Sequence, residues 1–217
     1  MTAPSWKAFR MFVLAAFLIV SPALARHASG QAGTLLEPAT VESDLKYRFK
    51  LTSMDLRVLR PRIKHQNEEL VLTLGKCIES ENIPYMGFWD RLRVDREAFE
   101  STGLTGLNSR QIKALRTARQ DSESEVANEW VSEYLQSLTG SLDLDWLQTE
   151  YATQLFQKEA QRRLDLLSTG HDQTRGIDPD WRKLTTEREA RFRAILSTEQ
   201  VRDYDSMTNV PAEHLIG

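Results

Sequence analysis

Residues 107–112, Leu107-Asn108-Ser109-Arg110-Gln111-Ile112, have the sequence pattern of a helix start. The side chain of Asn108 can accept a backbone N–H of the first turn, and Gln111, three residues later, can accept the N–H of Asn108. This reciprocal pair is a capping box. Leu107 and Ile112 flank it at the positions of a hydrophobic staple, which sets the direction from which the chain enters the helix.

The same pattern occurs twice more in the chain. It is found in Leu51-Thr52-Ser53-Met54-Asp55-Leu56 and in Leu196-Ser197-Thr198-Glu199-Gln200-Val201. Thr52 and Ser197 are the expected cap residues, and Gln200 completes its box as Gln111 does. Asp55 has a shorter side chain than glutamine, so we expect a weaker box there. Three starts of one kind predict a fold organised by capped helices.

Apolar residues recur at helical spacing after each start, and no segment beyond residue 25 alternates with the period of a strand. The first long helix should begin at Thr52. Pro61 predicts a kink or a split in it, because proline removes a backbone hydrogen bond. Gly75 is a candidate stop, and Asn82-Ile83-Pro84 predicts a break.

Further helices are expected along the rest of the chain. Residues 85–101 predict a short helix, and a long one should run from about Ser109 to Leu138. The glycine in Thr139-Gly140-Ser141 predicts a tight turn into a third long helix, from about Leu142 to Leu167, with Trp146 facing inward. Helices joined by so short a turn should pack as an antiparallel hairpin.

The last helices are marked by two start signals. Residues 168–177 predict a loop, and Asp178-Pro179 is typical of a helix start. At Ser197 the chain should either begin a new helix or continue the old one with a bend. We therefore predict an all-α fold of long amphipathic helices in antiparallel hairpins, elongated rather than globular. Residues 46–209 should form one domain, between a flexible lead-in at 26–45 and a tail at 210–217.

Residues 1–25 have the pattern of a secretory signal peptide. Lys7 and Arg10 precede the apolar run Met11–Val20, and Ala23-Leu24-Ala25 follows as a small-residue cleavage site. The apolar run is shorter than the roughly 20 residues of a membrane-spanning helix. We expect cleavage after Ala25 and a periplasmic or secreted protein without a membrane span, with a membrane anchor as the alternative.

Composition argues against several functions. Cleavage would remove Lys7 and Arg10 and no acidic residue, so the formal net charge would change from −3 to −5. A net negative chain is a poor partner for nucleic acid. The sequence contains no G-x-S-x-G, H-E-x-x-H or glycine-rich phosphate loop, and we predict no enzyme, no catalytic residue and no cofactor.

Histidine and cysteine give little support for a metal site. Of the four histidines, only His65 has carboxylates at helical spacing, Glu68 and Glu69, and zinc sites usually need three or four ligands. We predict no specific metal site. Cys77 is the only cysteine, so we expect it to be buried, with pairing between two chains as the alternative.

Charge is ordered along the two longest capped helices. Each is basic first and acidic later, which opposes the preference of the helix dipole. The first carries Arg57, Arg60, Arg62 and Lys64, then Glu68, Glu69, Glu79 and Glu81; the second carries Arg110, Lys113, Arg116 and Arg119, then Asp121, Glu123, Glu125, Glu129 and Glu133. We expect these helices to pair antiparallel, either with each other or across the two-fold axis of a homodimer. The alternative is a solvated polar face.

The capped starts resemble the repeated Leu-Thr-x-x-Gln motif of the Spy/CpxP family of periplasmic proteins. Phe192 to Gln200, followed by Tyr204, is the best match, and the starts at Leu107 and Leu51 are looser ones. Residues 85–101 and 140–180 have no counterpart. The resemblance implies an ATP-independent chaperone, an envelope-stress regulator or a metal-responsive sensor.

Of these three, the chaperone fits the sequence best, because long basic stems beside apolar side chains can hold unfolded segments without a cofactor. The partners would be unfolded or partner proteins. The candidate binding surface is formed by Arg57, Arg60, Arg62, Arg110, Lys113, Arg116 and Arg119.

Overall fold

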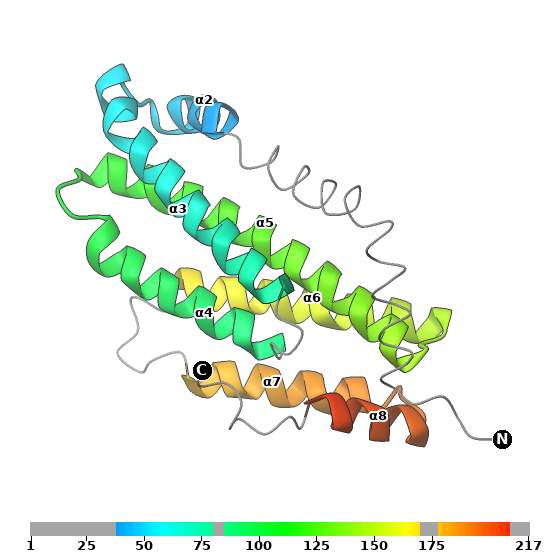
Figure 1. Cartoon of the computed structure of the whole chain (residues 1–217). Helices are drawn as coiled ribbons and strands as arrows, with labels where there is room; N and C mark the ends of the chain where they lie inside the picture. The colour runs from blue at the N-terminus through cyan, green and yellow to red at the C-terminus, as the bar shows by residue number, and fades with distance from the viewer. Residues whose placement is uncertain (1–37, 80–84, 170–177, 209–217) are drawn as a thin grey trace. The chain divides into compact units, whose positions relative to one another are not determined.

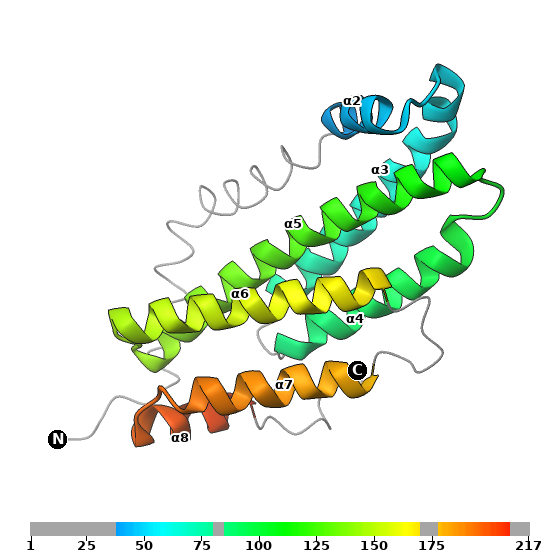
Figure 2. The same cartoon turned by 180° about the vertical axis from the view of Figure 1, so that it is seen from behind.

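The computed structural model describes residues 38–79, 85–169 and 178–208. Within these ranges every regular element is a helix, which confirms the predicted all-α class (Figures 1 and 2). Several predictions concern other residues and lie outside the described ones. They are the signal peptide, the lead-in up to residue 37, the break at 82–84, residues 170–177 of the loop predicted at 168–177, and the tail at 210–217. The first two residues of that loop are helical, so the loop prediction is wrong for Ser168 and Thr169.

The first described helix, α2, spans Pro38–Phe49, so the prediction of a flexible segment up to residue 45 is wrong for residues 38–45. Val41, Leu45 and Phe49 are four residues apart and form a narrow apolar stripe. Leu45 is buried, and the other two pack against the same core cluster. Such a short helix is stable only through tertiary packing, which the local sequence does not show.

Helix α3 spans Ser53–Glu79 without interruption. The predictions of a split at Pro61 and a stop at Gly75 are therefore wrong. A glycine inside a helix costs about 1 kcal/mol and a proline about 3 kcal/mol. The buried residues of α3 lie on both sides of these two positions, and their packing outweighs the cost. They include Leu59, Ile63, Leu70 and Leu74.

Helix α4 spans Tyr85–Ala98 and continues into a short π-helix, η1, at Phe99–Gly103. This confirms the predicted short helix. A Cβ added at Gly103 would lie 3.0 Å from Cδ2 of Phe99, so the glycine lets the ring fold back onto the backbone. Two carbonyls of this region, those of Gly103 and Thr105, accept hydrogen bonds from the Arg62 guanidinium at 2.6 and 2.9 Å.

The turn predicted at residues 139–141 is wrong, because these residues lie inside α5, which spans Ser109–Leu142. The chain turns after Asp143, which has the left-handed conformation with φ of 48° and donates its N–H to the Thr139 carbonyl. Glycine is the usual residue there, but aspartate is tolerated. Helix α6, Trp146–Thr169, then runs back along α5 (Figure 2).

Helix α7 spans Asp178–Arg193, and α8 spans Thr198–Thr208. Both predicted starts are confirmed, and at Ser197 the chain begins a new helix rather than continuing with a bend. Helix α7 is antiparallel to α6, since Arg163 contacts Thr185 at 2.8 Å and Glu159 contacts Arg188 at 2.9 Å. Helix α8 folds back against α7 through the Tyr204 hydroxyl, which donates to Glu189 at 2.9 Å.

Helices α3 and α5 are parallel, which makes the predicted antiparallel pairing between them wrong. Asp55 is bonded to Gln111 and Asn67 to Ser122, at 2.9 and 3.0 Å, so residue numbers rise together along both helices (Figure 1). The reason is α4, which connects them in sequence and runs antiparallel to α5, so that α5 starts at the same end as α3. The two-fold dimer stays a prediction.

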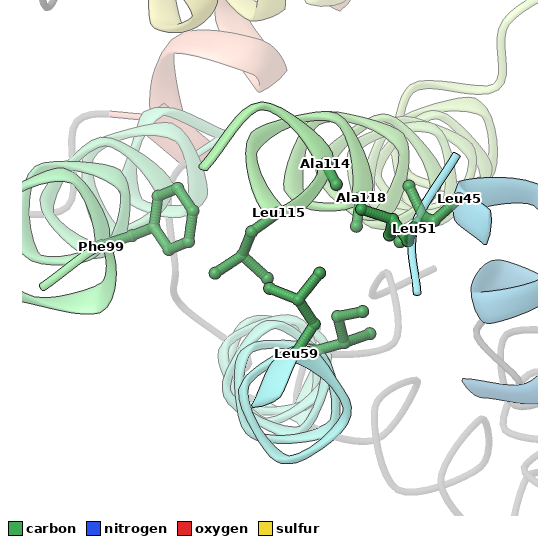
Figure 3. Close-up of a cluster of buried hydrophobic side chains, with 8 residues drawn as sticks. Leu45, Leu51, Leu59, Phe99, Ala114, Leu115 and Ala118 are labelled. Carbon is green, nitrogen blue, oxygen red and sulfur yellow. The ribbon is translucent and has the colours of Figure 1, made fainter. Parts of the chain in front are cut away.

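The described core contains a cluster at the N-terminal halves of α3 and α5. Figure 3 shows Leu59 of α3 and Leu115 of α5 pointing toward each other, with Phe99 on one side and Leu45 and Leu51 on the other. Further along, aromatic rings of α4, α5, α6, α7 and α8 form a continuous network. Its members include Tyr85, Phe88, Trp89, Trp130, Tyr134, Phe156, Trp181, Phe192 and Tyr204.

Candidate functional site

All three predicted capping boxes are present. Asn108 Oδ1 accepts the N–H of Gln111, and Gln111 Oε1 accepts the N–H of Asn108, both at 3.0 Å. Ser197 and Gln200 exchange the same two bonds at 3.2 and 2.8 Å. At the first start, Thr52 Oγ1 accepts from the Asp55 N–H at 3.1 Å.

The shorter side chain of Asp55 still closes its box. Its Oδ2 accepts the Thr52 N–H at 2.9 Å and the Thr52 hydroxyl at 2.7 Å. In this box the Thr52 hydroxyl therefore acts both as an acceptor, from the Asp55 N–H, and as a donor, to the Asp55 carboxylate.

The structure contains a fourth box that the sequence reasoning missed. Asp145 Oδ1 accepts the N–H of Gln148 at 2.8 Å, and Gln148 Oε1 accepts the N–H of Asp145 at 3.0 Å. The signal was present, because Leu144-Asp145-Trp146-Leu147-Gln148 has the spacing of the other starts. A turn placed at Gly140 made these residues look like the inside of a helix.

The four boxes are joined in two pairs. Gln111 Nε2 donates to Asp55 Oδ1 at 2.9 Å, which ties the start of α5 to that of α3. Gln148 and Gln200 each donate to the other's Oε1, at 2.9 and 3.1 Å, and so tie α6 to α8. Gln148 and Gln200 also donate to the carbonyls of Ile195 and Leu142. The motif therefore both begins the helices and fastens them to each other.

The pairing reveals a repeated unit of three helices. In α3–α4–α5 the first and third helices begin with joined boxes, and the middle helix runs back between their ends. The same description holds for α6–α7–α8. Each unit thus holds two helix starts at a fixed separation.

The pair of α6 and α8 gives a direct stability test. We expect Gln148→Ala to lower the free energy of unfolding by about 1–2 kcal/mol, because it removes a cap and leaves carbonyl and amide partners unsatisfied. Gln154→Ala is the matched control, since Gln154 is exposed on the same helix and bonds Glu150. Denaturant unfolding of both variants measures the difference, and equal stabilities would contradict the role of the joined boxes.

The stability that the joined boxes of α3 and α5 contribute should depend on pH. The Thr52 backbone N–H and hydroxyl, with a further bond from Gln111, lower the pKa of Asp55. A lowered pKa stabilises the fold above the unfolded value, and this is lost as the pH falls through the folded pKa. The stability difference between the wild type and Asp55→Asn should be largest near neutral pH and shrink below about pH 4. Gln200→Ala, which involves no titrating group, should show no such trend in parallel unfolding titrations.

The predicted basic surface is only partly a surface. Arg119 is 1% exposed and pairs with Glu123 at 2.7 Å, so it is excluded from any solvent-facing site. Arg116 pairs with Glu100 at 2.7 Å. Arg62 is half-buried and donates to the carbonyls of Gly103, the last residue of η1, and of Thr105.

The remaining predicted residues are exposed. Arg60 pairs with Glu42 at 2.7 Å, and Arg110 donates to the Lys50 carbonyl at 3.4 Å. Arg57 and Lys113 are also exposed. The seven residues therefore do not form one continuous basic face, because several of them are used to fasten helices.

Several charged residues are buried in ion pairs, which spacing along the sequence does not distinguish from exposed ones. Glu123 of α5 bonds Arg96 of α4 at 3.0 Å as well as Arg119, and both guanidinium groups lie over the Phe99 ring. A second buried group joins Glu159 and Arg163 of α6 to Arg188 of α7. Low-dielectric surroundings make such groups costly to break.

Three large apolar side chains are exposed close together in sequence at the start of α6. Trp146 is 76% exposed, Leu147 is 67% exposed, and Tyr151 is also exposed. We call these three residues the α6 patch. The prediction that Trp146 faces the core is wrong, because the buried stripe of α6 runs through Ala152, Phe156, Ala160 and Leu167, and Trp146 in the first turn lies off this stripe. The joined boxes hold the first turn of α6 and therefore present the patch from a fixed backbone.

Cys77 is buried, as predicted, and burial raises the pKa of its thiol. The thiolate is the reactive form of cysteine, so this environment does not favour reaction. For metals, His65 lies 3.4 Å from Glu69. In the described ranges no three or more His, Cys, Asp or Glu side chains are grouped as they would be around a metal ion.

No family model, curated protein or solved structure matches this chain. Among the described helices, none combines the length and apolarity that a membrane crossing requires. The predictions of a Spy/CpxP-type relationship, of an exported protein and of a protein without enzyme activity stay predictions.

Proposed function

We propose that this chain is an exported protein-binding protein that holds unfolded or partner proteins without a nucleotide or other cofactor. The observation that carries the proposal is the α6 patch. Large apolar side chains gathered on a surface commonly mark sites of protein interaction. Tryptophan and tyrosine are also the side chains that most often dominate such interfaces.

The surroundings of the patch support loose binding of unfolded segments. The exposed carboxylates of Asp143, Asp145 and Glu150 adjoin it in sequence. An apolar group edged by charge keeps the protein in solution while it offers apolar contact. The joined boxes hold the backbone, so the cost of ordering the binding surface is low. The resemblance to the Spy/CpxP chaperones favours the same function.

The test is an aggregation assay without nucleotide. Purified protein from residue 26 onward is mixed with reduced lysozyme and, separately, with heat-denatured malate dehydrogenase. We expect light scattering of both clients to fall near a stoichiometric ratio. Suppression of neither would contradict the proposal, and suppression of one alone would favour a binder with one specific partner.

The location of the site is tested by the double variant Trp146→Ser/Leu147→Ser. We expect it to need about fivefold more protein for the same suppression, because it removes most of the exposed apolar area of the patch. Leu72→Ser is the control, since Leu72 is an exposed leucine on α3. Equal losses in the two variants would show that binding does not depend on the α6 patch. Circular dichroism checks that both variants keep their helix content.

A further inference from the structure

Helix α5 carries four acidic residues spaced by four, which places them along one stripe of the helix. They are Asp121, Glu125, Glu129 and Glu133. Like charges at this spacing destabilise a helix unless cations compensate. Asp121 pairs with Arg48 of α2 at 3.6 Å. Within the described ranges, no side chain forms an ion pair with the other three.

The contact with α2 shows what kind of segment this side of α3 and α5 accepts. Leu45 of α2 is buried in the cluster that also contains Leu59 of α3 and Ala118 of α5, and Figure 3 shows it close to Ala118. Arg48, three residues later, reaches Asp121. A helix with an apolar stripe and a cation therefore packs on α3 and α5 here (Figure 1).

The same combination continues beyond α2. The parallel register, set by the bond between Asn67 and Ser122, places the stretch of α3 from Val71 to Ile78 beside the stretch of α5 from Glu125 to Glu133. Val71 is 44% exposed and Ile78 is 40% exposed. Apolar side chains of α3 and carboxylates of α5 are thus repeated about two turns further along.

Partial burial makes the carboxylates of Glu125 and Glu133 poorly solvated. Burial raises the pKa of Glu125, with a contribution from Asp121, and raises that of Glu133, with a contribution from Glu129. A cation brought close to them would relieve both the desolvation and the repulsion. Arg48 offsets part of this at Asp121, where burial still raises the pKa.

We propose that the face formed by Val71, Ile78, Glu125, Glu129 and Glu133 binds a basic amphipathic helix of a partner protein. The apolar stripe of the partner would cover Val71 and Ile78, and its lysine or arginine residues would pair with the three glutamates, as α2 does one step earlier. This face is distinct from the α6 patch and does not depend on it.

The probe is a fluorescein-labelled peptide with leucines on one helical face and lysines on the other, followed by fluorescence anisotropy. A peptide with glutamate in place of each lysine is the control. We expect the lysine peptide to bind about tenfold more tightly, and to weaken as salt is raised. Equal binding of the two peptides by the wild-type protein would overturn the proposal.

Two triple variants locate the site. Glu125→Gln/Glu129→Gln/Glu133→Gln should bind the lysine peptide about tenfold more weakly. Glu69→Gln/Glu97→Gln/Glu199→Gln removes the same charge from exposed positions elsewhere and should bind within about twofold of the wild type. Equal weakening by both would reduce the effect to net charge and overturn the proposal. Trp146→Ser/Leu147→Ser tests the α6 patch as the alternative peptide site: a loss of lysine-peptide binding as large as that in the Glu125, Glu129 and Glu133 variant would place the peptide on the α6 patch and overturn this proposal, whatever the outcome of the aggregation assay.

Discussion

Glu123→Gln is expected to lower the free energy of unfolding by about 3–5 kcal/mol. Glu123 is buried and bonds Arg96 at 3.0 Å and Arg119 at 2.7 Å. The substitution keeps the shape of the side chain but removes its charge. Arg96 retains Glu100 at 3.4 Å, whereas Arg119 would keep no carboxylate that forms an ion pair with it in the described structure.

Glu97→Gln is the matched control for this variant. Glu97 is an exposed residue of α4 that pairs with Arg93 at 3.3 Å, and exposed pairs contribute about 1 kcal/mol or less. Urea unfolding of the two variants measures the difference. A loss at Glu123 no larger than that at Glu97 would show that the interior of α4 and α5 accommodates the unpaired guanidinium.

Trp89→Ala is expected to cost a similar amount, about 3–5 kcal/mol, for a different reason. The side chain is 0% exposed and touches the network of rings from several helices. Its neighbours are Phe88, Tyr85 and Trp181, with centroids 5.3, 6.2 and 6.3 Å away, and the Arg163 guanidinium lies over it. Removing the indole leaves a cavity that α4, α6 and α7 cannot all close.

Trp146→Ala applies the same substitution at an exposed position. We expect a change in stability of about 0.5 kcal/mol or less, because the side chain is mostly in solvent. Thermal unfolding should therefore separate two tryptophans that look alike in the sequence. A large destabilisation at Trp146 would mean that the α6 patch is part of the fold rather than a surface for binding.

Local sequence signals determined where several helices begin and that the fold is all-α. The starts at Thr52, Asn108 and Ser197 were predicted from a cap residue and a partner three positions later, and Asp178-Pro179 predicted the start of α7. Each signal is complete within one helical turn, so its outcome does not depend on distant residues. The all-α class followed from the same signals and from apolar residues at helical spacing.

The tertiary structure decided which helices meet and which charges are buried. Helix α2 depends on packing against α3 and α5, and α3 continues through Pro61 because its buried stripe does. The turn formed at Asp143 rather than at Gly140, the fourth box begins α6 directly after it, and Trp146 in the first turn of α6 is exposed. Arg119 and Arg57 have the same side chain and both belong to the basic first part of a capped helix, yet one is buried on Glu123 and the other is in solvent. Burial depends on the neighbouring helices, and spacing along one helix does not encode it.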